Sequence, residues 1–266
     1  MTLDVLVDNR SCNDLCETEH GLSILLTTGG CRILLDTGAS DLLLRNAERI
    51  GVELGEVDYV FISHGHSDHA GGLRHFLKIN RKAKLIVSPY AIKGEFYSCR
   101  NGEHSITAEW PEDMNDRLIV VDHSCTIDEK LHVIAQIAKE HNLPKANDNL
   151  FAVDDQGRKI KDDFRHELAL YINGMLFTGC AHSGLENILG ACSRPVHTVI
   201  GGFHLLDGYE TEDEQRELAE KLTAKYPNTV FYTSHCTGDH VFENMKEIMA
   251  EHLRPFKCGM RIVTRR

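Results

Sequence analysis

Residues 64–69 read H-G-H-S-D-H and place three imidazoles and one carboxylate within six positions. These are the donor groups expected around Zn²⁺, Mn²⁺ or Fe²⁺. With this spacing His64 and His66 can hold one cation while Asp68 and His69 turn toward a second. An isolated histidine is usually an ordinary polar residue, but this density directly after an apolar run predicts a site for two divalent metal ions. The segment cannot complete two coordination shells alone, so further ligands must come from elsewhere.

Three later histidines each follow a short apolar run that predicts a strand. His182 lies in the glycine-bounded loop G-C-A-H-S-G, where core packing is a poor explanation and metal binding a good one. His235 lies in the loop S-H-C-T-G and is expected to bind metal in the same way. His204, in G-G-F-H-L, is expected to complete a metal shell, contact a substrate phosphate or donate a proton to a leaving group.

Three further residues are reserve candidates. His166 stands just before a predicted strand and is an additional candidate ligand. Cys180 is either a thiolate ligand or a buried thiol. Asp36 is expected to accept a hydrogen bond from a metal-bound imidazole, which would fix the ring and raise its basicity. The sequence does not identify the residues that bind the substrate.

The elements that must position these residues alternate between strands and helices. Apolar runs bounded by turn residues predict strands over residues 3–7, 22–27, 31–35, 59–63, 84–88, 167–172, 175–178, 198–200 and 229–233. Helical spacing predicts helices over residues 42–50, 73–80, 185–192 and 212–226. Residues 131–139 fit either a helix or a strand. This order favours sheets with helices packed on them.

Residues 90–117 differ from the rest because they mix aromatic and polar residues without clean periodicity. A long irregular segment of this kind is often a lid or a binding loop. We therefore expect a lid or substrate insertion at about 90–117. No linker divides the chain convincingly, so residues 1–266 are expected to form a single domain.

Composition narrows the class of protein. The 266 residues contain no apolar stretch near the roughly 20 residues that span a bilayer, and no secretory leader is visible, so a cytoplasmic protein without a membrane partner is expected. Nine cysteines at irregular spacing favour reduced thiols. The net charge of −11 disfavours nucleic acid, whereas metal ions would still admit a small anionic substrate. The oligomeric state is not predicted.

Several of these motifs together resemble the metallo-β-lactamase fold superfamily. The segment H-G-H-S-D-H-A-G-G-L is similar to its signature, and L-L-D-T-G at residues 34–38 to its preceding strand and turn. The strand and turn L-F-T-G-C resembles the one on which many members carry a metal-bridging aspartate, and here Cys180 stands in that place. This departure suggests that His182 or Cys180 takes over a ligand role. The strand and loop that end in H-C-T-G resemble those bearing the last metal histidine of the superfamily, here His235.

The resemblance implies a four-layer αββα sandwich of the metallo-β-lactamase type, a single domain with two metal ions at one edge. It also points to a narrower subfamily, the metal-dependent hydrolases similar to 7,8-dihydropterin-6-methyl-4-(β-D-ribofuranosyl)-aminobenzene-5′-phosphate synthase. On this basis we hypothesise that one cation is held by His64, His66 and His182 and that the other is held by Asp68, His69 and His235, with zinc ahead of manganese or iron.

The function expected from this arrangement is hydrolysis by a metal-bound hydroxide, with Asp68 orienting the hydroxide and His204 assisting. A phosphoester is favoured over a carboxylic ester or lactam because hard cations suit phosphoryl oxygens. One alternative is a synthase that condenses a phosphoribosyl donor with an aminobenzoate or pterin-type precursor. Others are a di-iron redox protein, which normally works with a flavin module not recognised in this sequence, and a non-catalytic metal binder.

Overall fold

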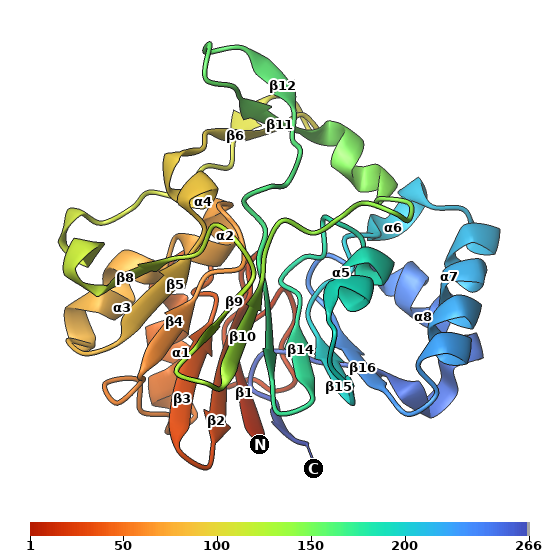
Figure 1. Ribbon diagram of the computed structural model, residues 1–266. Helices are drawn as coiled ribbons and strands as arrows, with labels where there is room; N and C mark the ends of the chain where they lie inside the picture. Colours follow the sequence, from red (N-terminus) through yellow and green to blue (C-terminus); the bar gives the residue numbers. More distant parts are fainter. Residues whose placement is uncertain (265–266) are drawn as a thin grey trace.

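Two seven-stranded sheets lie face to face in the computed structural model, which describes residues 1–264 apart from the side chains of residues 113 and 115 (Figure 1). The first sheet has the order β18 (Arg261–Val263), β1 (Thr2–Val7), β2 (Ser23–Thr28), β3 (Cys31–Leu35), β4 (Tyr59–Phe61), β5 (Lys84–Val87) and β8 (Leu118–Val120). The second has the order β17 (Leu253–Pro255), β16 (Val230–Thr233), β15 (Thr198–Ile200), β14 (Met175–Phe177), β13 (Ala169–Ile172), β10 (Leu131–Ile134) and β9 (Cys125–Ile127).

The central core forms because alternate side chains of each strand point between the sheets. In β2, Ile24 and Leu26 join this core, whereas Leu25 belongs to the cluster on the outer face. In β13, Leu170 likewise faces inward and Tyr171 outward. The strand alternation read from the sequence therefore decides which residues meet between the two sheets.

Helices cover both outer faces and complete four layers (Figure 1). The first sheet is covered by α1 (Leu42–Arg49) and α3 (Leu73–Ile79). The second is covered by α5 (Leu185–Ala191), α7 (Glu212–Lys225) and α8 (Asp239–Met249). The predicted αββα sandwich is confirmed, and so is each predicted helix to within two residues at either end.

Parallel pairing brings the predicted functional loops to one edge of the sandwich. Strands β3, β4 and β5 run parallel in the first sheet, as do β14, β15 and β16 in the second. The carboxyl ends of parallel strands meet at the same edge of a sheet. The loops after β4, β14, β15 and β16 carry the candidate histidines, so the topology collects them there.

A third, four-stranded sheet lies across the top of the sandwich in Figure 1. Its order is β12 (Lys159–Lys161), β11 (Leu150–Val153), β6 (Phe96–Ser98) and β7 (His104–Ser105), and α4 (Pro89–Lys93) precedes it. The sequence placed a lid at about 90–117, whereas this sheet also recruits residues 150–161. Its strands have only two to four residues, and β7 and β12 are exposed, so they give no alternation long enough for the sequence to predict them.

The remaining elements are short. Strand β10 settles the ambiguous stretch 131–139, and α2 (Ser67–Ala70) and α6 (Leu206–Tyr209) are single turns beside the histidine-bearing edge. Within residues 1–264, no helix is both long enough and apolar enough to cross a membrane.

Candidate metal centre

Three imidazoles, those of His64, His66 and His182, converge at the edge of the sandwich. Each offers a ring nitrogen within 4.8 Å of the others, and all three side chains are buried. None of their Nε2 atoms has a hydrogen-bond partner among the described residues. Leaving one buried polar atom unpaired costs about 1–3 kcal/mol, so three together indicate a missing ligand. A metal ion fits this set, because neutral imidazole is a common metal donor.

The other nitrogens of two of these rings fix the tautomer that a metal needs. The Ser63 hydroxyl donates to Asp36 and lies 2.8 Å from Nδ1 of His64, so that nitrogen carries the proton. Nδ1 of His182 lies 3.1 Å from Oδ1 of Asn147, whose amide nitrogen donates to the His182 carbonyl. Burial, together with the neighbouring imidazoles, holds the pKa of His64 well below its usual range. The rings therefore present Nε2 lone pairs.

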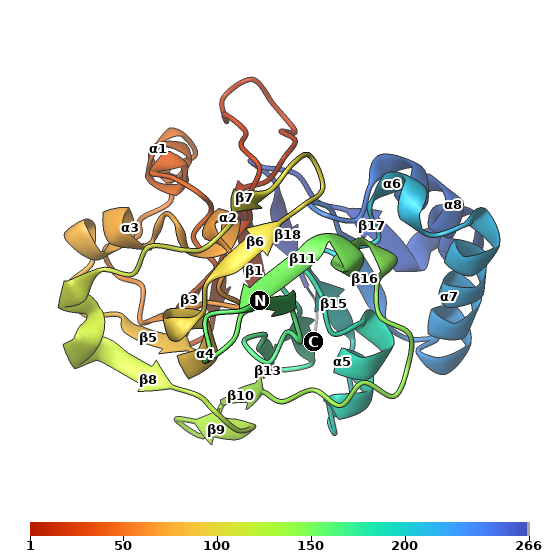
Figure 2. The same ribbon diagram turned by 90° about the horizontal axis from the view of Figure 1, so that it is seen from above.

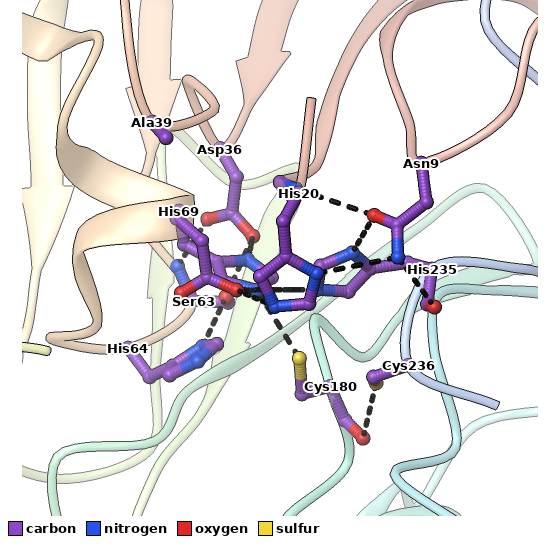
Figure 3. A network of polar contacts seen from close by, with 12 residues as sticks. Asn9, His20, Asp36, Ala39, Ser63, His64, His69, Cys180, His235 and Cys236 are labelled. Atoms are coloured by element: carbon purple, nitrogen blue, oxygen red, sulfur yellow. Dashed lines mark hydrogen bonds and ion pairs between the residues drawn. The ribbon is translucent and has the colours of Figure 1, made fainter. Parts of the chain in front are cut away.

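A second cluster adjoins the first and contains Asp68, His69, His235 and Cys180 (Figure 3). The Nε2 atoms of His69 and His235 are 3.1 Å apart, and Oδ2 of Asp68 lies 3.4 Å from Nε2 of His235. The Cys180 sulfur lies 3.1 Å from Nε2 of His69. Imidazole, carboxylate and thiolate are all donors that zinc accepts. The two clusters adjoin closely, because a nitrogen of His64 also lies within 4.8 Å of His69 and of the Cys180 sulfur.

Electrostatics keep the acid of this cluster ionised. Burial raises the pKa of Asp68, but the charge of His69 and hydrogen bonds from His20 and His235 outweigh it and leave the pKa well below its usual range. Burial lowers the pKa of His69, but Asp68 and Asp36 raise it to about 9. In the metal-free protein His69 therefore carries a proton that a metal ion must displace.

Buried oxygens from distant parts of the chain orient the second cluster. Asp36 accepts a hydrogen bond from Nδ1 of His69 at 2.6 Å, the contact predicted from the sequence. Oδ1 of Asn9 lies 3.0 Å from Nδ1 of His235 (Figure 3). Asp8 accepts a hydrogen bond from the backbone nitrogen of His235. Such contacts hold ligand rings in place and raise their basicity.

His204 and Cys236 lie against these clusters. The ring of His204 is 4.1 Å from that of His182, and neither of its nitrogens has a partner among the described residues. Its backbone has a φ of 50°, an uncommon value outside glycine. A nitrogen of His204 also lies within 4.8 Å of the Cys180 sulfur and of His182. His204 is therefore placed to contact either an ion or a bound substrate.

The geometry leaves no ring nitrogen of His166 for an ion. Its Nδ1 accepts a hydrogen bond from the backbone nitrogen of Gly65, and its Nε2 lies 3.0 Å from Oδ2 of Asp162. The imidazole therefore supports the backbone between His64 and His66. His166 was expected as an additional ligand, but both of its ring nitrogens are already engaged within the protein.

Sequence reasoning missed several residues of the site. Nε2 of His20 lies 3.3 Å from Oδ2 of Asp68. Glu167 accepts hydrogen bonds from the backbone nitrogens of His182 and Ser183, both at 2.7 Å. Asn147 holds the imidazole of His182 through the contact between Oδ1 and Nδ1. None of these residues has a motif of its own, so only their spatial position identifies them.

A cleft of about 320 Å³ opens onto both clusters. One wall of the cleft is formed by residues of the two clusters and their neighbours: His66, Asp68, Cys180, His182, His204, His235 and Cys236. The facing residues come from the small sheet and its connecting loop: Ser98, Arg100, Asn101, His104, Ser105 and Leu150. This volume lies at the small end of the range for ligand sites. The cleft connects the candidate metal centre to solvent.

Comparison with known proteins agrees with this architecture. Residues 17–95 match the sequence profile of the Metallo-beta-lactamase superfamily. The crystal structure of Tm1679, described as a metal-dependent hydrolase of the β-lactamase superfamily, has a TM-score of 0.82 and 28% identity and covers 99% of both chains.

Two relatives from Methanocaldococcus jannaschii are similar over most of their length. The uncharacterized protein MJ0448 is 29% identical over 92% of this chain and 94% of its own. The 7,8-dihydropterin-6-methyl-4-(β-D-ribofuranosyl)-aminobenzene-5′-phosphate synthase is 26% identical over 83% of this chain and 82% of its own. The chain therefore has the metallo-β-lactamase fold, and the sequence profile of that superfamily matches its residues 17–95.

Proposed function

We propose that this protein is a metal-dependent hydrolase that acts on a phosphoester or another small anionic ester. The observation that supports it is the convergence of three buried, unpaired Nε2 atoms, those of His64, His66 and His182, beside the ionised Asp68. Two divalent ions held there would lower the pKa of water and polarise the scissile group. Zinc is the preferred metal because it accepts imidazole and carboxylate donors and the Cys180 sulfur lies beside them, with manganese and iron as the other candidates.

The protein's own side chains would orient the reactants. The Asp68 carboxylate, kept as an anion by its imidazole neighbours, accepts a hydrogen bond from the attacking water and aligns it. His204 lines the same cleft with both ring nitrogens unpaired among the described residues, so one of them can donate a proton to the leaving oxygen. The cleft's small volume favours a metabolite over a polymer.

Metal reconstitution combined with an ester panel tests this function. Protein freed of metal by a chelator is reloaded separately with Zn²⁺, Mn²⁺ or Fe²⁺ and assayed on p-nitrophenyl phosphate, bis(p-nitrophenyl) phosphate and p-nitrophenyl acetate. We expect at least one ion to restore phosphoester hydrolysis. The variant His66→Ala should retain neither metal nor activity, whereas His123→Ala, at an exposed histidine outside the centre, should retain both. Absence of hydrolysis with every ion would reject the proposal.

A synthase is the second candidate, because the similarity to the M. jannaschii synthase covers 83% of this chain. In that case a phosphoribosyl donor would condense with an aminobenzoate or pterin-type precursor. Incubation with phosphoribosyl pyrophosphate and an aminobenzoate distinguishes the two functions. Release of pyrophosphate and carbon dioxide would favour the synthase, whereas unchanged substrates would favour the hydrolase.

A further inference from the structure

Backbone hydrogen bonds join the hairpin of β6 and β7 directly to the histidine motif at residues 64–69. The backbone nitrogen of Ser67 donates to the carbonyl of Ile106 at 2.7 Å, and that of Ala108 donates to the carbonyl of Gly65 at 3.1 Å. The Thr107 hydroxyl accepts from the Phe96 nitrogen and donates to its carbonyl, which closes the base of the hairpin. Figure 2 shows β6 and β7 above α2, the turn that carries Asp68. The hairpin therefore has a fixed position relative to the metal centre.

The tip of this hairpin presents polar groups to the cleft. Arg100, Asn101 and His104 line the cleft opposite the histidine clusters. The tip turns at Gly102, whose φ of 88° suits glycine, and Nδ1 of His104 lies 3.0 Å from the Gly102 carbonyl. That contact fixes the His104 ring and leaves its Nε2 available to a ligand. A guanidinium, an amide and an imidazole are a donor set typical of anion binding.

Arg100 has no acidic partner in the described part of the chain. The nearest acid in sequence, Glu103, is instead paired with Lys159, whose Nζ also lies 4.1 Å from the centre of the Tyr97 ring. Among the described residues lining the cleft, Arg100 is the only arginine or lysine and Asp68 the only carboxylate. Asp68 is already engaged by His20, His69 and His235. Arg100 is therefore an exposed cation at the cleft, without an acidic partner among the described residues.

We infer that Arg100 binds a second anionic group of the substrate, a phosphate or carboxylate separate from the ester that is hydrolysed. This inference rests on the proposed hydrolase function and narrows it. The substrate would be a small metabolite with anionic groups at both ends, one at the histidine clusters and one at the hairpin tip. Arginine suits the second position because its planar donors bind phosphate or carboxylate in a bidentate manner.

Calorimetric titration of the metal-loaded protein with non-hydrolysable phosphonates tests this inference. Methylphosphonate carries one anionic group, whereas alkane bisphosphonates and carboxyalkylphosphonates with two to five carbons carry two. The wild type should bind the best two-headed probe at least tenfold more tightly than methylphosphonate. Comparison of the bisphosphonates with the carboxyalkylphosphonates shows whether a phosphonate or a carboxylate is preferred as the second group.

Substitution of Arg100 should remove this preference. Arg100→Ala should weaken binding of the best two-headed probe about tenfold or more, as for the loss of a hydrogen bond to a charged group, and change methylphosphonate binding less than twofold. Arg100→Lys should retain part of the effect. Arg81→Ala, at an exposed arginine outside the cleft, has the same change in charge and should bind as the wild type does. The metal content of each variant is measured alongside.

Two results would overturn the inference: a wild type without preference for two-headed probes, or an Arg100→Ala variant that keeps the preference. Because phosphonates are not hydrolysed, these outcomes do not depend on turnover. Failure of the ester panel with an intact Arg100-dependent preference would reject the hydrolase and leave the anion site standing. Turnover of phosphoesters without a preference for two-headed probes would support the hydrolase and reject the anion site.

Discussion

Replacing Asp36 with asparagine should weaken metal binding without changing any direct ligand. The Asp36 carboxylate is fully buried and accepts three hydrogen bonds, from the backbone nitrogen and hydroxyl of Ser63, both at 2.7 Å, and from Nδ1 of His69 at 2.6 Å. In Asp36→Asn the amide oxygen can keep the Ser63 backbone bond. The amide nitrogen then faces Nδ1 of His69 with donor against donor.

As a neutral metal ligand, His69 can relieve that clash only by moving its Nδ1 proton to Nε2. This nitrogen faces Asp68, His235 and Cys180 and must carry the lone pair that a metal ion needs. Loss of a hydrogen bond to a charged group costs about 1.5–3 kcal/mol. Loss of a residue that orients a metal ligand typically weakens metal affinity 10–100-fold, or about 1.4–2.7 kcal/mol. The two ranges agree, so this one contact can account for the full effect.

Competition against a chromophoric chelator measures the affinity, and denaturant unfolding of the metal-free variant measures its stability. Asp4→Asn is the matched control, because Asp4 is also buried and pairs with Arg261 at 2.6 Å but lies outside the centre. We expect Asp4→Asn to lose stability and to keep metal affinity within about twofold. Equal metal affinity in Asp36→Asn and the wild type would refute the reasoning.

Three other predictions follow from the same geometry. Burial lowers the pKa of His69, but two neighbouring carboxylates raise it from its usual 6.5 to about 9. The resulting stabilisation of the metal-free fold is fully present below pH 6.5 and is lost as the pH rises through 9. Metal uptake near pH 7 should therefore release about one proton, which calorimetry in buffers of different ionisation enthalpy can detect. Gly202→Ala would place a Cβ 2.3 Å from the Cys236 sulfur and should lower the free energy of unfolding in denaturant by about 1–3 kcal/mol. In the control Gly190→Ala the new Cβ meets no described atom within 4 Å, so the free energy of unfolding should be unchanged or up to about 1 kcal/mol higher. Asn147→Ala removes the acceptor that holds an imidazole of the first cluster and should weaken metal binding about tenfold in the chelator competition.

The sequence could predict the candidate ligands because their order along the chain reflects strand topology. His64, His66, Asp68 and His69 are neighbours in sequence, so their proximity is local. The loop bearing His182 and the later histidine loops follow parallel strands, whose carboxyl ends meet at one edge. Periodicity and turn residues are enough to locate such strand ends, whereas the αββα fold and its metal-bearing edge were implied by the resemblance to the metallo-β-lactamase superfamily.

The supporting residues could not be predicted in the same way. Asn147 contacts His182 across 35 positions and stands in no recognisable motif. The resemblance places Asn9 at the rim of the site, but not its contact with His235 across 226 positions. Their roles depend on tertiary packing that a single sequence does not encode locally. Helix α8 could have been predicted from the sequence, because its buried Val241, Met245 and Met249 recur every four residues, as expected of a helix.

The proposed hydrolysis depends most directly on where metal ions bind to the protein. Crystals of protein reloaded with zinc, measured on both sides of the zinc absorption edge, would locate the ions by anomalous scattering. We predict one peak about 2.0–2.1 Å from the Nε2 atoms of His64, His66 and His182, and a second bound by Asp68, His69 and His235. The absence of anomalous density at these residues, or zinc bound only elsewhere on the protein, would contradict the metal centre on which the proposed hydrolysis rests.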